Sequence, residues 1–506
     1  MKRLVVIAIA LWACDKKPAP EGRSEPAALR TEGSDHARSE EERAARGAVT
    51  ADPCARARAV EGEVMPWIID DLPSALACAR ARKVPVAIDL WAPWCHTCLS
   101  MQTTVFTDPS LKPAVERFVF ARLDTDKPVN ADAVGRYPPS AWPTFYVVGE
   151  DRSTGKPETV LARFVGAASL SQFHAFLDAG LKAQQGGAAG ADAHLLGAER
   201  AIAVKDLPTA EQELVAALAQ APADWSRRGD SLTALILTKR RRGDFPGCLE
   251  TAEKSIDDTG SAANATDFVI HAMACADELK ADAAWAARVK KLRERAVARL
   301  TRLVADDNRA MSIDDRSDAL ANLRSILDAL GKPAEAKATA ERQRAMLDDA
   351  AVKAPTAIAA MTFNWQRCEV YVYLGRPLEM VPALEKSAHD LPNEYDPRAR
   401  MGWIYLKAGK LPEAARWTDE ALRLVYGPRK ARVLAQRIEI ADQQGDKAAA
   451  RLFREETVKL WEQMPPGQAS PEALAKAKEA VSALDAPAGS GSGSGSASAS
   501  ASARKL

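Results

Sequence analysis

The chain has 506 residues, which is too many for one ordinary hydrophobic core, so two or more domains are expected. Apolar residues make up 47% and charged residues 27%, the balance of a globular protein. The 69 Lys and Arg residues against 68 Asp and Glu residues leave no net field to hold a polyanion. The strongest basic run, Lys239 to Arg242, closes an apolar helical stretch, where cations complement the carbonyl end of a helix. The sequence therefore excludes nucleic acid as a partner.

The amino terminus has the pattern of an export signal. Met1 to Arg3 is a positive start, Leu4 to Leu11 is almost wholly apolar, and the chain turns polar after Cys14. This apolar run is too short to span a bilayer. A small residue followed by cysteine at the cleavage point resembles the lipobox of bacterial lipoproteins, which implies that Cys14 becomes the lipidated first residue of the mature chain. Trp12 departs from the lipobox pattern, so a plain signal peptide with an incidental cysteine stays open.

Composition and patterning divide the rest of the chain into segments. Residues 15–50 have almost no large apolar side chains and are expected to form a disordered tether. Residues 51–183 alternate between short strand-like and helical runs, and residues 184–192, with their paired glycines, are expected to be a linker. Residues 193–485 are helical in pattern, and residues 486–506 form a low-complexity Gly/Ser and Ala/Ser tail.

The helical half carries a recurring turn signal. Gly375, Gly409 and Gly445 follow one another at intervals of 34 and 36 residues, and less regular copies stand at Gly331 and Gly243. Each glycine lies between two amphipathic stretches, where a turn favours glycine. A period near 34 resembles that of tetratricopeptide repeats. A helical array without that repeat stays open, and either kind of stacked helix pairs offers a concave surface to another polypeptide.

The motif that carries chemistry lies within residues 84–104, VPVAIDLWAPWCHTCLSMQTT. Val86 to Trp91 predicts a buried strand, Pro93 breaks it, and Cys95 opens a helix. The amino terminus of a helix stabilises a thiolate on Cys95 and lowers its pKa, which makes Cys95 the attacking nucleophile. Cys98, one turn further on, is then the resolving cysteine that breaks the mixed disulfide with a substrate.

The segment Trp91-Ala92-Pro93-Trp94-Cys95-His96-Thr97-Cys98 resembles the active-site loop of thioredoxins and their envelope relatives. This resemblance implies an α/β thioredoxin-like domain, with a central mixed sheet flanked by helices, and a redox-active Cys95–Cys98 disulfide. Asp89, six residues before Cys95, falls where the family keeps a buried acid that transfers protons at the resolving cysteine. Trp91 and Trp94 complete the loop.

The resemblance extends beyond the loop. Ala141 to Phe145 matches the start of the strand that carries the cis-proline of the family, which makes Pro143 a substrate contact. Gly166 occupies the position of another family glycine. Thr104 to Pro109 is similar to the segment after the active site in the C-terminal domain of the transmembrane reductant conveyor DsbD. Together these motifs cover about 130 residues and are specific as a set, whereas two cysteines alone are not.

Three residues of the active-site region depart from the cytosolic thioredoxins. His96 and Thr97 stand where those proteins carry Gly and Pro, and Trp142 before Pro143 is bulky for its position. A histidine between the cysteines is expected to stabilise the Cys95 thiolate and to raise the reduction potential. Trp142 is expected to select among substrates. The direction of electron flow therefore stays open.

Other uses of the CxxC motif find less support. A zinc site needs two further ligands at matching spacing, and the sequence has no second CxxC and no HxxxH, so no metal is expected. Covalent haem attachment needs histidine directly after the second cysteine, where this chain has Leu99. A purely structural disulfide is the remaining alternative, and Asp89, Trp94 and Pro143 favour the redox-active interpretation over it.

Five cysteines remain besides Cys14 and the CxxC pair. Cys54 and Cys78 are placed to link the start of the thioredoxin-like segment to its first helix, and Cys248 and Cys275 fall on neighbouring predicted helices. Both pairs are possible disulfides, and buried free thiols stay open for each because sequence alone does not fix connectivity. Cys368, on an apolar helix, is expected to be a buried thiol.

These features predict a thiol–disulfide oxidoreductase of the bacterial cell envelope, lipid-anchored with its domains in the periplasm. Cys95 and Cys98 are expected to reduce disulfides in exported proteins, with electrons from a membrane donor of the DsbD type, as the resemblance implies. The helical repeats are expected to recruit a protein partner, and no cofactor is needed because the cysteines carry the electrons. Two alternatives stay open: an envelope adaptor or chaperone-like scaffold whose thioredoxin fold is a docking module, and an oxidase of protein dithiols.

Overall fold

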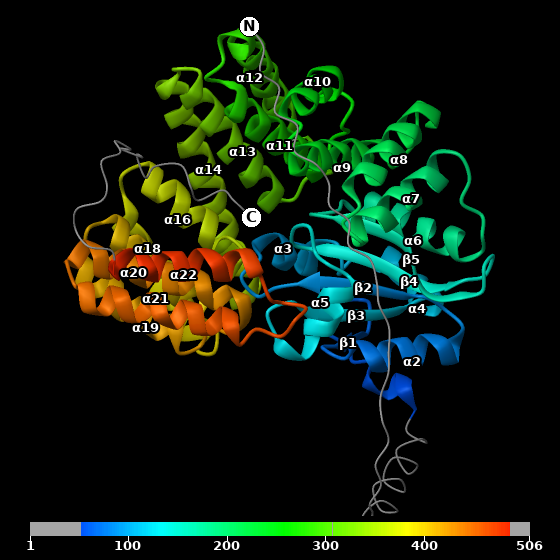
Figure 1. The fold of residues 1–506 in the computed structure, drawn as a ribbon, viewed down its shortest axis with the longest axis horizontal. Coiled ribbons are helices and arrows are strands. Elements are labelled where there is room, and N and C mark those ends of the chain that lie inside the picture. The colour runs from blue at the N-terminus through cyan, green and yellow to red at the C-terminus, as the bar shows by residue number, and fades with distance from the viewer. Residues whose placement is uncertain (1–51, 306, 486–506) are drawn as a thin grey trace, which may run out of the picture. The chain divides into compact units, whose positions relative to one another are not determined.

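The computed structural model describes residues 52–305 and 307–485 (Figure 1). Cys14, the expected tether and the expected tail therefore lie outside the described residues. The described chain begins with an α/β part built on five strands and continues as helices alone to Asp485. The fold class predicted from the sequence, a thioredoxin-like α/β domain followed by an all-α domain, is confirmed.

The α/β part contains a five-stranded mixed sheet in the order β1-β3-β2-β4-β5. Strands β1, β3 and β2 run parallel, and β4 and β5 are antiparallel to their neighbours. The elements of this part are η2 Pro53–Arg56, β1 Trp67–Ile69, α2 Leu72–Arg82, β2 Val86–Trp91, α3 His96–Thr104, η3 Pro109–Leu111, α4 Ala114–Arg117, β3 Val119–Asp124, η4 Pro128–Asn130, α5 Ala131–Arg136, β4 Thr144–Asp151, β5 Lys156–Val165 and α6 Leu170–Gln184.

Both faces of the sheet are covered, because alternate residues of the central strand β2 face opposite layers. Val86, Ile88 and Leu90 belong to the apolar cluster that includes residues of α2. Ala87 belongs to the cluster on the other face, where aromatic side chains from β4 and α6, Phe145 and Phe173 among them, fill the core. This second layer supports α3, the helix that starts directly after Cys95.

The helical part consists of helices that pack mainly against their neighbours in sequence. Its elements are α7 Ala191–Ala203, α8 Leu207–Gln220, α9 Arg228–Arg241, α10 Phe245–Ser255, α11 Ala263–Leu279, α12 Ala283–Leu303, α13 Ile313–Ala329, α14 Pro333–Lys353, α15 Ala357–Met361, α16 Asn364–Tyr373, η5 Pro377–Met380, α17 Val381–Asp390, α18 Asp396–Lys407, α19 Leu411–Leu422, η6 Gly427–Arg429, α20 Lys430–Gln444, α21 Lys447–Glu462 and α22 Pro471–Asp485. None of the described helices is long and apolar enough to cross a membrane.

The recurring glycines end helices in left-handed backbone. Gly409 has φ +71° between α18 and α19, and Gly445 has φ +73° as the C-cap of α20. An L-residue with a side chain is strained in this conformation, which is why glycine recurs at these turns. The periodic signal in the sequence therefore marks the ends of helices.

The helical part contacts the α/β part at more than one place. α6 ends at Gln184 and α7 begins at Ala191, so six residues separate them within the expected linker. Arg200 of α7 donates from Nε to the carbonyl oxygen of Val160 in β5, at 3.0 Å. Much later in the chain, Gln468 donates from Nε2 to the carbonyl oxygen of Thr125, at 2.7 Å. Figure 1 shows these late helices, α18 to α22, beside the sheet.

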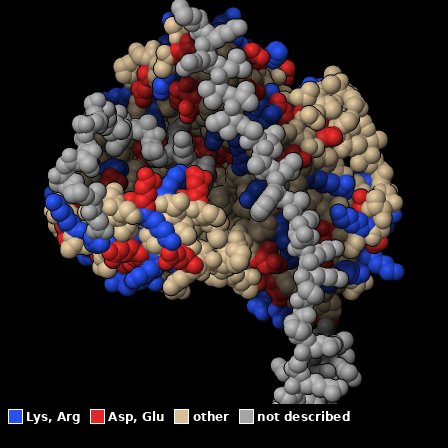
Figure 2. All heavy atoms as spheres, in the orientation of Figure 1, with Lys and Arg blue, Asp and Glu red and all other residues tan. Residues whose placement is uncertain are grey.

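Figure 2 shows that acidic and basic side chains are interspersed over the drawn face of the molecule. This agrees with the even balance of charges in the sequence.

Candidate functional site

The two cysteines of the CxxC motif lie at the amino terminus of α3, directly after strand β2. Cys95 is the N-cap residue of α3, and its sulfur accepts a hydrogen bond from the backbone N–H of Cys98 at 3.0 Å. The two sulfurs form a disulfide. An N-cap sulfur faces the unpaired N–H groups and the positive end of the helix dipole, which favour a thiolate on Cys95 after reduction. Cys95 is 4% exposed and Cys98 2% exposed.

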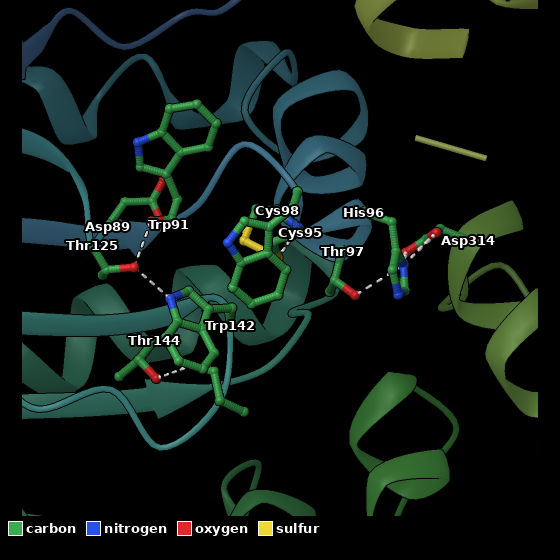
Figure 3. Close-up of a disulfide and its surroundings, with 12 residues drawn as sticks. Asp89, Trp91, Cys95, His96, Thr97, Cys98, Thr125, Trp142, Thr144 and Asp314 are labelled. Atoms are coloured by element: carbon green, nitrogen blue, oxygen red, sulfur yellow. Dashed lines mark hydrogen bonds and ion pairs between the residues drawn. A yellow bond between two sulfur atoms is a disulfide. The ribbon is translucent and has the colours of Figure 1, made fainter. Parts of the chain in front are cut away.

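Three tryptophans surround the disulfide. Trp91, Trp94 and Trp142 pack against both cysteines, and the ring centroids of Trp94 and Trp142 are 5.2 Å apart. The indole N–H of Trp142 donates to Oγ1 of Thr125 at 2.7 Å, as Figure 3 shows. The indole N–H of Trp94 donates to a carboxylate oxygen of Asp126, also at 2.7 Å. The rings of Trp94 and Trp142 are therefore held in fixed orientations beside the sulfurs.

The loop before β4 adds Pro143 to the site. The peptide bond between Trp142 and Pro143 is cis, and the carbonyl oxygen of Pro143 accepts from the backbone N–H of Gly166 at 2.9 Å. Oγ1 of Thr144 donates to the carbonyl oxygen of Ala141 at 2.6 Å, which closes the loop on itself. The segment around Pro143 therefore lies at the site, as the sequence predicts. Its Pro143 contacts Gly166, and its Trp142 packs against the cluster that contains the cysteines.

Asp89 lies in the middle of β2 and is buried. Its Oδ2 accepts from Nε of Arg122 at 3.3 Å, while its Oδ1 has no hydrogen-bond partner. Arg122 is held mainly by Glu63, with Nη2 and a carboxylate oxygen 2.7 Å apart. Burial raises the pKa of Asp89 to about 6 although Arg122 opposes the rise. A carboxyl group with this pKa can hold or release a proton near neutral pH.

His96 turns away from the disulfide and toward the helical part. Its Nδ1 lies 2.9 Å from a carboxylate oxygen of Asp314 at the start of α13, and Figure 3 shows the imidazole on that side. Burial opposes the charged imidazolium, but the carboxylates of Asp314 and Asp318 outweigh it and raise the pKa of His96 to about 10. The sequence led us to expect that this cation would act on the Cys95 thiolate. In the structure the imidazolium of His96 is instead paired with the carboxylate of Asp314.

A second contact from the helical part covers the active-site loop. The guanidinium of Arg429 lies 4.1 Å from the ring centroid of Trp94, and Trp94 packs against the cluster of Tyr395, Val425 and Val433. The hydroxyl of Tyr426 donates to Asp124, next to the loop that orients the tryptophans. The helical part is therefore built into the surroundings of the dithiol.

Thr97 is partly buried beside His96, with its Oγ1 3.4 Å from His96 Nδ1. The ligand atoms of His96, Asp314 and Asp318 lie within 4.8 Å of one another, so this is a group of described side chains that could hold a cation. The ion pair with Asp314 already satisfies the imidazole nitrogen, and we assign no metal to the group.

The remaining cysteines are internal to the two parts of the chain. Cys54 and Cys78 are joined in a disulfide between η2 and α2, and Cys248 and Cys275 in a disulfide between α10 and α11. Cys368 in α16 is a buried free thiol, and burial raises its pKa to about 12. Cys368 is therefore unreactive at neutral pH.

Sequence reasoning missed the residues that come to the site from other elements. Asp124 ends β3, and Thr125 and Asp126 follow it; the carboxyl end of a parallel strand beside β2 was a signal that could have found them. Asp314 and Arg429 lie in the helical part, and no local pattern distinguishes them from other charged residues on amphipathic helices.

Comparisons with known proteins agree with this geometry. Residues 67–147 match the family model described as thioredoxin-like. Over 105 residues the chain is 29% identical to the thiol:disulfide interchange protein DsbD of Pseudomonas fluorescens, a stretch that covers 20% of this chain and 18% of that relative. The chain thus matches about a fifth of the length of this curated relative.

Two solved structures cover more of the chain at lower similarity. A tetratricopeptide repeat protein from Parabacteroides merdae is 15% identical, with 58% of this chain and 98% of the other covered and a TM-score of 0.37. PilF of Pseudomonas aeruginosa is 16% identical, with 57% and 97% covered and a TM-score of 0.28. These scores are too low to carry an argument. The CxxC geometry and the matched segment together identify a thioredoxin-like domain, similar to part of DsbD, and the chain continues after it as helices alone to Asp485.

Proposed function

We propose that the protein is a thiol–disulfide oxidoreductase that reduces disulfides in exported proteins through Cys95 and Cys98. The observation that carries the proposal is the placement of the Cys95 sulfur at the N-cap of α3, where it accepts the N–H of Cys98. The similarity of 105 residues to DsbD supports the same class of chemistry. Asp89, buried in the strand before the motif, supplies a proton acceptor.

In this reaction the Cys95 thiolate attacks one sulfur of a substrate disulfide. The substrate bond breaks, a mixed disulfide forms with Cys95, and the other substrate sulfur leaves as a thiolate. Cys98 then loses its proton to Asp89 and attacks the Cys95 sulfur. This step releases the second substrate thiolate and restores the Cys95–Cys98 disulfide. Two electrons pass to the substrate, and a dithiol donor of the DsbD type, membrane-bound, must return two electrons to the cysteine pair.

We further propose that the chain works in the periplasm of a bacterial cell envelope, held to the membrane by a lipid on Cys14. The positive and then apolar start of the sequence supports this. The helical domain is proposed to recruit a protein partner, which raises the effective concentration of its disulfide near Cys95. Membrane fractionation of the full chain and of Cys14→Ser tests the anchor, since only the variant should be released without detergent.

The direction of electron flow is tested by the equilibrium reduction potential of Cys95–Cys98, poised against glutathione mixtures. A potential near about −270 mV supports a reductase, and one near about −120 mV makes the protein a dithiol oxidase instead. Cys98→Ser should trap a mixed disulfide with substrate at Cys95, whereas Cys95→Ser should trap none. If the cysteine pair is neither oxidised nor reduced in these mixtures, the protein is instead an adaptor or scaffold. The low exposure of Cys95 also favours that function.

A further inference from the structure

The basic run Lys239 to Arg242 at the end of α9 divides into two pairs in the structure. Lys239 donates from Nζ to a carboxylate oxygen of Glu211 at 2.6 Å, and Arg242 forms an ion pair with the same carboxylate. These two cations have ordinary structural partners. Arg240 and Arg241 contact uncharged groups instead, so the whole run cannot be explained as the charged end of a helix.

Arg241 reaches across to the α/β part and meets Ser140. Its Nη1 donates to Oγ of Ser140 at 3.1 Å, and its Nη2 donates to the carbonyl oxygen of Ser140 at 3.0 Å. Arg163 of β5 donates to the same Oγ, while its Nε donates to the hydroxyl of Tyr146 at 3.0 Å. Two guanidinium groups therefore share one hydroxyl oxygen as acceptor.

Arg240 adds a third cation to this group. Its Nη1 lies 2.9 Å from Nδ1 of His271 in α11. Burial, together with Arg240 and Arg241, lowers the pKa of His271 to about 3, so the imidazole is neutral and accepts the hydrogen bond. Burial and the charges of Arg163 and Arg240 lower the pKa of Arg241 as well. Arg241 therefore lies close enough to Arg163 and to Arg240 for their like charges to repel its own.

The acidic side chains near these charges have other ion-pair partners. Within residues 52–305 and 307–485, no acidic side chain forms an ion pair with Arg163, Arg240 or Arg241. Glu199 accepts the backbone N–H of Arg163 and its carboxylate also attracts the Arg163 charge, but its ion pair is with Arg227 at 3.0 Å. The carboxyl end of α9 offers only about half an elementary charge, which is much less than three cations need.

The position of the group relates it to the dithiol. Ser140 stands three residues before Pro143, in the loop whose Trp142 ring packs on Trp94 and on the cysteines. Three residues of extended chain span about 10 Å at most. A polypeptide that reacts at Cys95 and follows this loop would bring a side chain two or three positions from its cysteine to Ser140.

We propose that Arg163 and Arg241, which share Ser140 as acceptor, form with the neighbouring Arg240 a subsite for a carboxylate of the polypeptide whose disulfide reacts at Cys95. The inference rests on the proposed function and names the class of substrate. Planar guanidinium groups bind the two oxygens of a carboxylate in a fork, and an anion here relieves the repulsion among the arginines. Exported proteins with an acidic residue two or three positions from a reactive cysteine are then the preferred substrates.

The test compares two short peptides that carry one cysteine in a mixed disulfide with a neutral thiol. They differ only in Glu or Gln three residues from that cysteine. The reduced full chain should reduce the Glu peptide with a kcat/KM about tenfold higher than the Gln peptide, the size of one charge-assisted contact. Arg241→Gln should abolish the preference, and Arg242→Gln is the matched control, since it removes the same charge one residue away and should retain it.

Equal rates for the two peptides, or equal effects of both arginine variants, would overturn the inference while the reductase function stands. If neither peptide is reduced, the proposed function fails, and the subsite is then judged by binding alone. For that purpose Cys95→Ser and Cys95→Ser with Arg241→Gln are titrated with both fluorescently labelled peptides. Tighter binding of the Glu peptide only where Arg241 is present supports the subsite.

A free anion is the other source of the same chemistry. Inorganic phosphate is therefore titrated into the full chain by calorimetry, with Arg241→Gln beside it. Phosphate binding that depends on Arg241, together with equal binding of the two peptides, would reject the polypeptide carboxylate and assign the site to a small anion.

Discussion

Nδ1 of His96 lies 2.9 Å from a carboxylate oxygen of Asp314, a residue 218 positions further along the chain. This pair joins the active-site motif to the helical domain and fixes the imidazole on the side away from the sulfurs. The carboxylate is 1% exposed, so removing it leaves a buried charge unpaired and costs more than breaking an exposed surface ion pair. The charge next to Cys95 is therefore controlled by a residue of another domain.

The first prediction concerns Asp314→Asn. The variant should lose about 3 kcal/mol of the free energy of unfolding, because it leaves the imidazolium of His96 without its first partner. In the native chain the pKa of His96 is raised to about 10, so the contribution of this pair is full below pH 6.5 and is lost as the pH rises toward 10. The deficit of the variant should shrink over the same window. Urea unfolding at pH 6, 8 and 10 measures it.

Asp349→Asn is a matched control, because Asp349 pairs with Lys353 on an exposed face and is 61% exposed. It should change the free energy of unfolding by less than about 0.5 kcal/mol at every pH. A deficit of Asp314→Asn that stays constant from pH 6 to pH 10 would contradict the role of His96 in it.

The second prediction concerns access to Cys95. Because Cys95 is 4% exposed and Trp94 is covered by Arg429, alkylation of the reduced chain should require the helical domain to open locally. Tyr426→Phe removes the hydroxyl that donates to Asp124 and should raise the alkylation rate about tenfold, the effect of one hydrogen bond to a charged acceptor. Stopped-flow alkylation, with mass spectrometry to assign Cys95, measures the rate.

Tyr405→Phe serves as its control, since Tyr405 is a half-buried tyrosine of the helical part that packs on Leu406, Ala414 and Ile440. Equal alkylation rates for Tyr426→Phe and the unaltered chain would show that the helical domain does not limit access.

The third prediction concerns the buried acid of β2. Burial raises the pKa of Asp89 from 3.8 to about 6, so the native chain holds a proton there that the unfolded chain has released. The free energy of unfolding should therefore fall as the pH rises from about 4 to about 6. Asp89→Asn removes this dependence and should be more stable than the unaltered chain at pH 7 by on the order of 2 kcal/mol. It should also slow the release of the second substrate thiol.

Denaturation at pH 4 and pH 7 and single-turnover release kinetics check the two effects of Asp89→Asn. Asp132→Asn is the control, because Asp132 is exposed and pairs only with Arg136 in α5 among the described residues. If Asp89→Asn is stabilised but releases thiol at the normal rate, Asp89 is a buried acid without a part in proton transfer.

What the sequence predicted correctly about the fold depends on neighbouring residues. The strand Val86–Trp91, the break and the helix after Cys95 are fixed within twenty residues, and the glycine turns require only a local left-handed backbone. The orientation of His96 could not be predicted in this way. A histidine beside a cysteine suggests an effect on the thiolate. The imidazole of His96 instead pairs with the carboxylate of Asp314, which the tertiary fold brings next to it.

The basic run of α9 shows the same limit. The sequence predicts a charged helix end, and Lys239 and Arg242 fit that prediction through Glu211. Arg241 instead turns toward Ser140, which is 101 positions away. Whether a cation has an acidic partner depends on which elements pack around it, and degenerate helical repeats give no register from which to read that packing.

The last prediction concerns the disulfide between Cys248 and Cys275, which joins α10 and α11 inside the core of the helical domain. Closing a loop of 27 residues restricts the unfolded chain, so the double replacement of both cysteines by alanine should lower the free energy of unfolding by about 3 kcal/mol. Loss of two buried sulfurs adds a small cavity cost. The thioredoxin-like part has its own core, so the potential of Cys95–Cys98 should stay unchanged. Chemical denaturation and redox titration of the same variant measure both, and a shifted potential would mean that the helical core reaches the dithiol through α11 and α13.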